Sequence, residues 1–154
     1  MILGLSIALG IILFDQASKF FIFNNVLGQY DIIQVTPFFN LVKAWNTGVS
    51  FSMFNDYGVY GRIGLVIVAL LIVGALVLWL KSEKSKFMQI ALGFVIGGAI
   101  GNVIDRIRLG AVFDFLDFYI GTSHWPAFNV ADSFICIGAV MLIFKEIFLR
   151  EKSK

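Results

Sequence analysis

Long apolar stretches alternate with shorter polar segments along the 154 residues of the chain. A helix needs about 20 mostly apolar residues to cross roughly 30 Å of hydrocarbon, and four stretches meet this requirement. They cover about residues 1–23, 60–80, 87–106 and 128–148. The pattern therefore predicts an all-α membrane protein, in which four transmembrane helices form a single integral membrane domain over residues 1–154.

The polar segment 24–59 has features of β-structure. Gln29–Lys43 is rich in Ile, Val, Phe and Thr and is interrupted by Pro37, which favours two short strands. Asn46-Thr47-Gly48 is typical of a turn, and residues 49–54 alternate between apolar and polar positions. We expect a small sheet or loop layer on the membrane surface, with aromatic side chains in the headgroup zone: Tyr30, Phe38, Phe39, Trp45, Phe51 and Tyr57.

Composition agrees with a membrane protein and excludes some classes of partner. The chain is 59% hydrophobic and 14% charged, with a mean hydropathy of +0.90, which is more apolar than soluble domains are. A net charge of +2 is too small to indicate a nucleic-acid partner. The single cysteine, Cys136, falls in an apolar run, which excludes an internal disulfide and a cysteine-based metal cluster.

The positions of the charges predict the orientation in the membrane. Basic residues gather at the 81–86 loop and at the C-terminus: Lys81, Lys84, Lys86, Arg150, Lys152 and Lys154. The positive-inside rule makes both termini cytoplasmic and segments 24–59 and 107–127 extracytoplasmic. The first apolar stretch has no basic n-region and no small-x-small cleavage site after it, so we expect it to be retained. All the aspartates then map to the outer half of the protein.

Two charged residues interrupt the first apolar stretch. Asp15 and Lys19 are four residues apart, which places them on one face of a helix. They could form a structural ion pair, Lys19 could extend to the membrane surface, or the pair could lie near a functional site. The sequence pattern leaves these three possibilities open.

The acidic residues between 97 and 135 are the main candidates for chemistry. Asp114 and Asp132 should reach the same outer surface, because the third and fourth helices form a hairpin. Two carboxylates a few ångströms apart in a partly apolar site share a proton. The ionised carboxylate can activate water while the protonated one binds a carbonyl oxygen, as amide hydrolysis requires. Helix capping or surface exposure of these aspartates is an equally good interpretation of the residues alone.

Other chemistries have fewer candidate residues. His124 is the only histidine, so a multi-histidine metal site is excluded, and no Gly-rich phosphate loop occurs. The oxygens of Asp105, Asp114, Asp117 and Asp132 could in principle bind a metal ion. The residues around them are apolar and aromatic, which favours proton sharing, so we expect neither a metal nor another cofactor. We expect Asp105 to be a structural anchor beside Arg106, and Asp117 to be a solvated loop acid. His124 and Trp125 are expected to be interfacial loop residues.

Five short motifs carry a resemblance to a known family. They are Asp15-Gln16-Ala17-Ser18-Lys19, Asn46-Thr47-Gly48-Val49-Ser50-Phe51, Gly97-Gly98-Ala99-Ile100-Gly101-Asn102-Val103-Ile104-Asp105-Arg106, Val112-Phe113-Asp114-Phe115 and Phe128-Asn129-Val130-Ala131-Asp132. In order and spacing they closely resemble the lipoprotein signal peptidase (signal peptidase II) family over essentially the whole chain. Phe113 departs from the pattern, since many members have a valine there, but the residue remains apolar.

The resemblance implies an intramembrane aspartyl endopeptidase of the bacterial cytoplasmic (inner) membrane, with its active site toward the outer face. Such enzymes cleave prolipoproteins on the N-terminal side of the diacylglyceryl-modified cysteine of the lipobox. The resemblance makes Asp114 and Asp132 the catalytic pair. It implies that Asn46, Asn102, Arg106 and Asn129 line the site or orient substrate, and that Asp15, Lys19 and Asp105 support it.

The same resemblance implies an extracytoplasmic β-cradle and a mobile segment over the site, built from about Gln29 to Tyr57. Lipid-modified prolipoproteins, membrane lipids and globomycin-type inhibitors are the expected partners, and the protein is expected to be a monomer.

Two other functions are compatible with an acidic membrane protein. A proton-coupled transporter or channel would use Asp15 and Asp132 as a relay, but the embedded aspartates cluster toward one face and leave no acidic path to the inner side. A membrane scaffold without chemistry would tolerate substitution of the aspartates.

Overall fold

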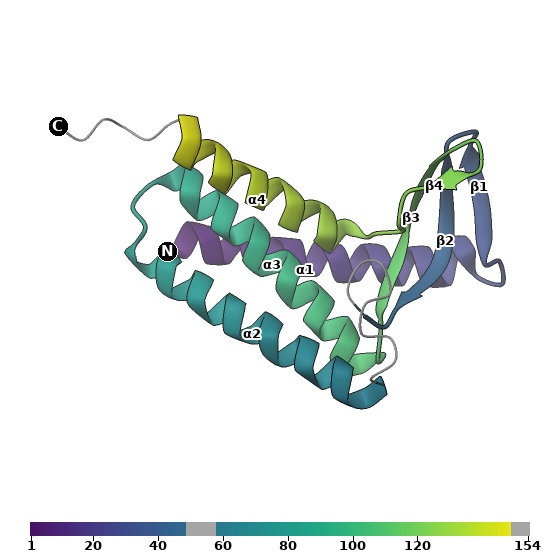
Figure 1. Ribbon diagram of the computed structural model, residues 1–154, viewed down its shortest axis with the longest axis horizontal. Coiled ribbons are helices and arrows are strands. Elements are labelled where there is room, and N and C mark those ends of the chain that lie inside the picture. The colour runs from purple at the N-terminus through teal and green to yellow at the C-terminus, as the bar shows by residue number, and fades with distance from the viewer. Residues whose placement is uncertain (49–57, 149–154) are drawn as a thin grey trace.

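The computed structural model describes residues 1–48 and 58–148. These residues form the long helices α1 (Ile2–Phe21), α2 (Gly58–Ser82), α3 (Lys86–Arg108) and α4 (Val130–Phe148), and a π-helix, η1 (Ile22–Leu27), that continues α1. An antiparallel sheet has the strand order β1 (Ile32–Thr36), β2 (Phe39–Asn46), β3 (Val112–Ile120) and β4 (Ser123–His124). The sheet stands at one end of the helices, and the N-terminus, the α2–α3 connection and the last turn of α4 lie at the other end (Figure 1).

Three of the helices are long and apolar enough to cross a membrane: Ile2–Leu27, Val59–Ser82 and Lys86–Arg108. Three of the four predicted spans are therefore helices whose length and composition suit a membrane span. The fourth predicted span forms a helix, α4, but it contains Asp132, Lys145 and Glu146, whereas each of the other three helices contains a long apolar stretch with at most two charged residues. Because α4 has only 19 residues, no stretch of 18 residues within it leaves out any of these three charged residues. By composition, therefore, α4 is not confirmed as a span.

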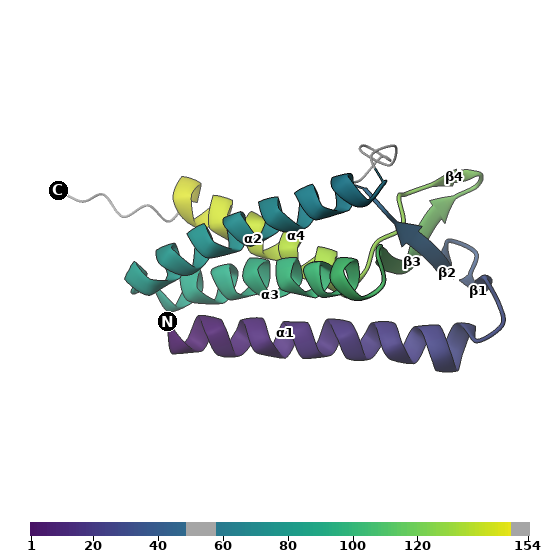
Figure 2. The same ribbon diagram turned by 90° about the horizontal axis from the view of Figure 1, so that it is seen from below.

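Helix α3 packs against the other helices and lies between α1 and the layer of α2 and α4 (Figure 2). Glycines make these contacts close. A Cβ atom on Gly93 would lie 2.6 Å from the carbonyl oxygen of Gly4, and one on Gly98 would overlap the carbonyl oxygen of Ala131. Backbone therefore touches backbone on both sides of α3, as the glycines of this stretch predicted.

The β1–β2 hairpin confirms the two short strands predicted around Pro37. Strand β3 was not predicted, because residues 107–127 were expected to be a connecting segment. Its sequence lacks period-two alternation, since Val112, Phe113, Asp114 and Phe115 are all buried. The strand pairs with β2, with Ala44 opposite Asp114.

Apolar packing fixes the start of β3 beneath the π-helix. Phe113 contacts the rings of Phe23 and Trp45, with centroid distances of 5.4 and 5.3 Å, and joins Leu27 and Phe115 in one buried cluster. Burying such large side chains stabilises the fold by about 1.5–3 kcal/mol each. Alternation of side chains along the strand then points Asp114 away from this cluster.

Some predictions concern residues outside the described ranges. These are the alternating segment 49–54, the interfacial aromatics Phe51 and Tyr57, the part of the mobile segment beyond Gly48, and the basic residues of the C-terminus.

Candidate active site

The first turn of α4 holds Asp132 in a capping box with Asn129. The backbone N–H of Asn129 donates to Oδ2 of Asp132 (3.2 Å), and the backbone N–H of Asp132 donates to Oδ1 of Asn129 (3.0 Å). This reciprocal pair satisfies two of the free N–H groups at the helix start. The capping interpretation therefore applies to Asp132, but it uses only one carboxylate oxygen.

Asp114 lies opposite, on β3, and is only 2% exposed, so it is not a surface acid. Its Oδ1 accepts from Asn129 Nδ2 (2.6 Å) and its Oδ2 accepts from Asn46 Nδ2 (3.2 Å). Burial, and secondarily the negative charge of Asp132, raise the pKa of Asp114 from its ordinary value of 3.8 to about 7. At neutral pH a substantial fraction of Asp114 therefore carries a proton.

Two asparagines connect the carboxylates. Asn129, which is fully buried, contacts Asp132 through its Oδ1 and Asp114 through its Nδ2. Asn102 donates from Nδ2 to Oδ1 of Asp132 (2.8 Å), and its Oδ1 accepts from Asn129 Nδ2 (3.2 Å). The structure thus brings together side chains from β2, β3, α3, α4 and the residue before α4: Asn46, Asp114, Asn102, Asp132 and Asn129.

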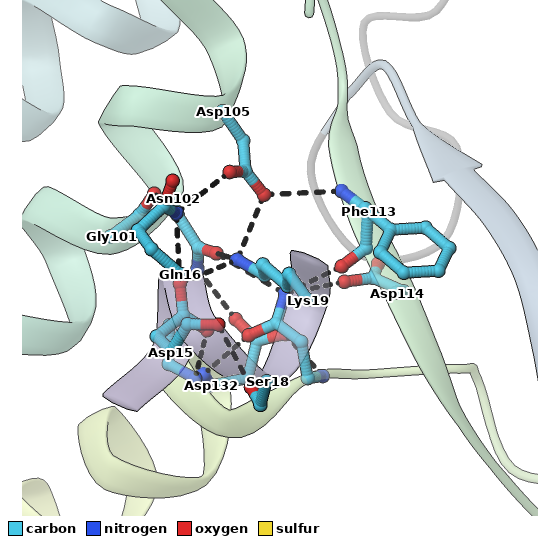
Figure 3. A network of polar contacts seen from close by, with 12 residues as sticks. Asp15, Gln16, Ser18, Lys19, Gly101, Asn102, Asp105, Phe113, Asp114 and Asp132 are labelled. Carbon is cyan, nitrogen blue, oxygen red and sulfur yellow. Dashed lines mark hydrogen bonds and ion pairs between the residues drawn. The ribbon is translucent and has the colours of Figure 1, made fainter. Parts of the chain in front are cut away.

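Behind the asparagines lies a buried ion-pair network (Figure 3). Lys19 Nζ is 2.8 Å from both Asp15 Oδ2 and Asp105 Oδ2, and it donates to Asn102 Oδ1 at 3.3 Å. Lys19 is 5% exposed, so it does not extend to the membrane surface, and the ion-pair interpretation holds. Asp105 pairs with this lysine, and its Oδ2 also accepts from the backbone N–H of Phe113 (3.3 Å).

Asp15 connects α1 directly to the start of α4. Its Oδ1 accepts from the backbone N–H of Ala131 (2.9 Å), which caps α4 from a different helix. A Cβ on Gly101 would lie 2.8 Å from Asp15 Oδ2, so only glycine leaves room for this carboxylate. The three residues expected to support the site, Asp15, Lys19 and Asp105, therefore hold α1, α3, β3 and α4 in register.

Arg106 lies at the edge of the same region. Its Nη2 donates to the carbonyl oxygen of Gly48 (3.0 Å), while its buried Nε has no partner among the described residues. An unpaired buried N–H is costly, and this Nε is the one buried side-chain nitrogen or oxygen atom without a partner among the residues that the structure describes.

Residues that the sequence did not single out complete the site and its surroundings. Gln16 donates from Nε2 to Asp105 Oδ1 (2.8 Å), and the amide in an apolar helix is the signal that could have found it. The prediction for Asp117 was wrong: it is 7% exposed and accepts from Asn40 Nδ2 (2.8 Å). Asn40 is its cross-strand neighbour, a pairing that the sequence could not provide without β3.

A cavity of about 540 Å³ opens beside Asp132. Its polar end is formed by Asn46, Asn102, Arg106 and Asp132, and apolar residues of α4, β3 and the segment before α4 form the rest: Val112, Trp125, Pro126, Ala127, Phe128, Ile135 and Cys136, with Ser133 between them. In the part of the chain that the structure describes, no three His, Cys, Asp or Glu side chains form a possible metal site. Asp132 therefore places a carboxylate, a group that can exchange protons, at the edge of a mostly apolar cavity.

Known proteins share this sequence and fold. The family model described as Signal peptidase (SPase) II matches residues 7–148. A lipoprotein signal peptidase of Aeromonas hydrophila subsp. hydrophila is 46% identical over 142 residues, which cover 91% of this chain and 84% of the relative. One of Vibrio vulnificus is 41% identical over 151 residues, 96% of this chain and 90% of the relative.

A solved structure of a bacterial membrane enzyme superposes with a TM-score of 0.79 at 29% identity, covering 98% of this chain and 93% of that chain. A second such structure gives 0.78 at 31% identity, over 94% and 92%. The chain therefore belongs to the lipoprotein signal peptidase (signal peptidase II) family of membrane peptidases.

Proposed function

We propose that the chain is an aspartyl endopeptidase that cleaves diacylglyceryl-modified prolipoproteins on the N-terminal side of the lipidated cysteine. Family membership supports the substrate class. The observation that carries the aspartyl chemistry is the shared contact of Asp114 and Asp132 with Asn129, directly behind the point where Asp132 lines an apolar cavity.

The two carboxylates have different surroundings, which suggests different roles. Asp132 lies at a helix N-terminus and accepts two N–H bonds, so it is the ionised base that takes a proton from the attacking water. Asp114 carries the proton and donates it in a hydrogen bond to the scissile carbonyl oxygen. When the tetrahedral intermediate collapses, the C–N bond breaks and the proton on Asp132 passes to the leaving amine.

The membrane arrangement follows from the same proposal. We place α4 as a fourth span, because its charges lie at its two ends and residues 133–144 carry none. Lys81, Lys84 and Lys86 mark the end of the bundle farthest from the sheet as cytoplasmic, together with the N-terminus. The sheet is then an extracytoplasmic cradle, the pair faces outward, and the chain works as one domain and as a monomer.

The direct test is cleavage of a diacylglyceryl-modified prolipoprotein by the purified chain in liposomes. We expect release of the signal peptide, inhibition by a globomycin-type compound, and no release from the unmodified precursor. Equal cleavage of modified and unmodified precursors, or none of either, would contradict the proposal.

The raised pKa of Asp114 predicts an alkaline limit to activity. Because only the protonated form donates to the carbonyl oxygen, kcat/KM should fall about ten-fold per pH unit above about 7. The free energy of unfolding should also fall as pH rises. The pKa of Asp114 is about 7 in the folded state and 3.8 as its ordinary value, so the stabilisation from this proton is full below about 3.8 and is lost as pH rises through about 7. A pH profile of kcat/KM in liposomes measures the first effect.

Asn46→Ala provides the matched comparison for this profile. The hydrogen bond from Asn46 favours the charged carboxylate and lowers the pKa of Asp114, so its loss should move the alkaline limb to higher pH. A limb that stays in place, or moves to lower pH, would show that Asp114 does not set it.

A further inference from the structure

A second acid–base pair lies away from the aspartates, at the far end of the sheet. His124 Nδ1 is 2.9 and 3.0 Å from the two carboxylate oxygens of Asp117. Because an ionised carboxylate only accepts, Nδ1 is the donor. Asp117 is 7% exposed and also bound by Asn40, so the acceptor is fixed in the sheet. The His124 ring stacks on Tyr119, with a centroid distance of 4.9 Å and an interplanar angle of 16°.

The pair anchors the segment that forms one wall of the active-site cavity. Residues 125–128 follow His124 directly and line that cavity. The backbone N–H of Trp125 donates to the carbonyl oxygen of Phe118 (2.8 Å), and that of Phe128 donates to the carbonyl oxygen of Leu116 (3.1 Å). These two backbone bonds hold the wall at both ends, and His124, fixed by Asp117, is the residue that directly precedes it.

Trp125 borders a second cavity as well. This cavity, of about 520 Å³, is lined by Trp125 and His124 together with residues of the sheet end: Phe38, Phe118, Tyr119, Ile120 and Ser123. Trp125, which is 68% exposed, thus lines both the cavity beside Asp132 and this second cavity on the sheet. A large planar side chain in this position can set how a substrate chain passes the site.

We propose that Asp117 and His124 are positioning residues for substrate binding, which act by holding Trp125 and the wall up to Phe128 against the bound lipopeptide. This inference rests on the proposed function. No hydrogen bond or ion pair among the described residues joins this pair to Asp114 or Asp132. The pair therefore affects the binding of substrate and leaves the proton transfers at the carboxylates unchanged.

The test uses a synthetic peptide that carries a lipobox and a diacylglyceryl-modified cysteine, cleaved by the full chain in liposomes. His124→Ala should raise KM by roughly five- to ten-fold, the size of effect expected for one lost charge-assisted hydrogen bond, with kcat within about two-fold. His124→Asn should restore most of the lost affinity, because its Nδ2 can take the place of the imidazole Nδ1 as a donor to Asp117.

A double-mutant cycle tests whether His124 acts through the wall. Trp125→Ala should raise KM by a similar factor, and adding His124→Ala to it should change KM by less than about two-fold. Additive effects, an equal fall in kcat, or no rescue by His124→Asn would overturn the proposal and indicate a general loss of structure.

Gln34→Ala is the matched control. Gln34 donates from Nε2 to Tyr119 Oη (2.7 Å) at the same end of the sheet but does not line the cavity, so its loss should leave KM unchanged. Binding of the lipopeptide to the Asp114→Asn variant distinguishes a failure of the proposed function from a failure of the positioning role. If neither cleavage nor binding occurs with any variant, the proposed function fails; normal cleavage with an unchanged KM in His124→Ala overturns the positioning role alone.

Discussion

Asp114→Asn and Asp132→Asn are each expected to lower kcat for prolipoprotein cleavage by on the order of 10³-fold or more, while the protein remains folded and inserted. In Asp114→Asn the new side chain is neutral, as the buried strand position favours. Its single amide oxygen can still accept a hydrogen bond from either Asn129 or Asn46. It cannot pass a proton to the carbonyl oxygen at neutral pH. The asparagine at 132 keeps a cap on α4 through its carbonyl oxygen but is no longer a base.

Single-turnover cleavage in proteoliposomes measures this effect, with thermal unfolding in detergent recorded for each variant. Asp31→Asn is the control: the side chain of Asp31 is 88% exposed and lies 3.8 Å from Lys43, so both activity and stability should be unchanged. Full activity of either variant of the pair would reject the aspartyl mechanism. Silent substitutions at both positions would favour a scaffold without chemistry.

The sequence was sufficient to predict the positions of the helices and the polar residues that the structure brings together around Asp114 and Asp132. Uninterrupted apolar runs have few structural alternatives, which is why the boundaries of α2 and α3 lie within a few residues of the predicted spans. Asp114 and Asp132 were identified because an aspartate between apolar residues requires a partner or a function. The motifs then specified which aspartates were paired.

The sequence was not sufficient for interactions that depend on long-range pairing. Strand β3 is buried on both faces at its start, so it lacks the alternation that identifies a strand. Without β3, Asp117 had no visible neighbour, and its contacts with Asn40 and His124 could not be predicted. The bond from the Ala131 backbone to Asp15 spans 116 positions and depends on the packing of α1 against α4.

The capping box illustrates how one residue can serve both stability and chemistry. Asn129 and Asp132 have the spacing of a helix start, and capping was therefore an alternative to catalysis. In the structure the two interpretations are compatible, because Oδ2 of Asp132 caps the helix while Oδ1 faces Asn102 and the cavity. The same residue can therefore start α4 and still present a carboxylate oxygen to the cavity, as the proposed mechanism requires.

Lys19→Met is expected to destabilise the fold by about 3–5 kcal/mol, the largest stability effect among these variants. The lysine is the cation for two buried carboxylates, Asp15 and Asp105, at 2.8 Å from each. Methionine preserves the apolar part of the side chain and removes only the charge, so both carboxylates would remain buried without it. Activity should fall as well, because Lys19 also orients Asn102, which binds Asp132. Chemical unfolding in detergent micelles measures the free energy of unfolding.

Lys43→Met is the matched comparison, because its carboxylate partner Asp31 is 88% exposed and stays solvated when the lysine is lost. The main loss is the hydrogen bond from Lys43 Nζ to the carbonyl oxygen of Gly28 (2.7 Å), so the cost should be about 1.5–3 kcal/mol, less than that of Lys19→Met. Adding Asp15→Asn and Asp105→Asn to Lys19→Met should recover part of the lost stability, since the uncompensated charges are then removed. If Lys19→Met unfolds no more readily than Lys43→Met, the network does not hold the helices together. If the added asparagines lower stability further, the cost lies in lost hydrogen bonds such as that from Ala131 to Asp15, and buried charge is not its cause.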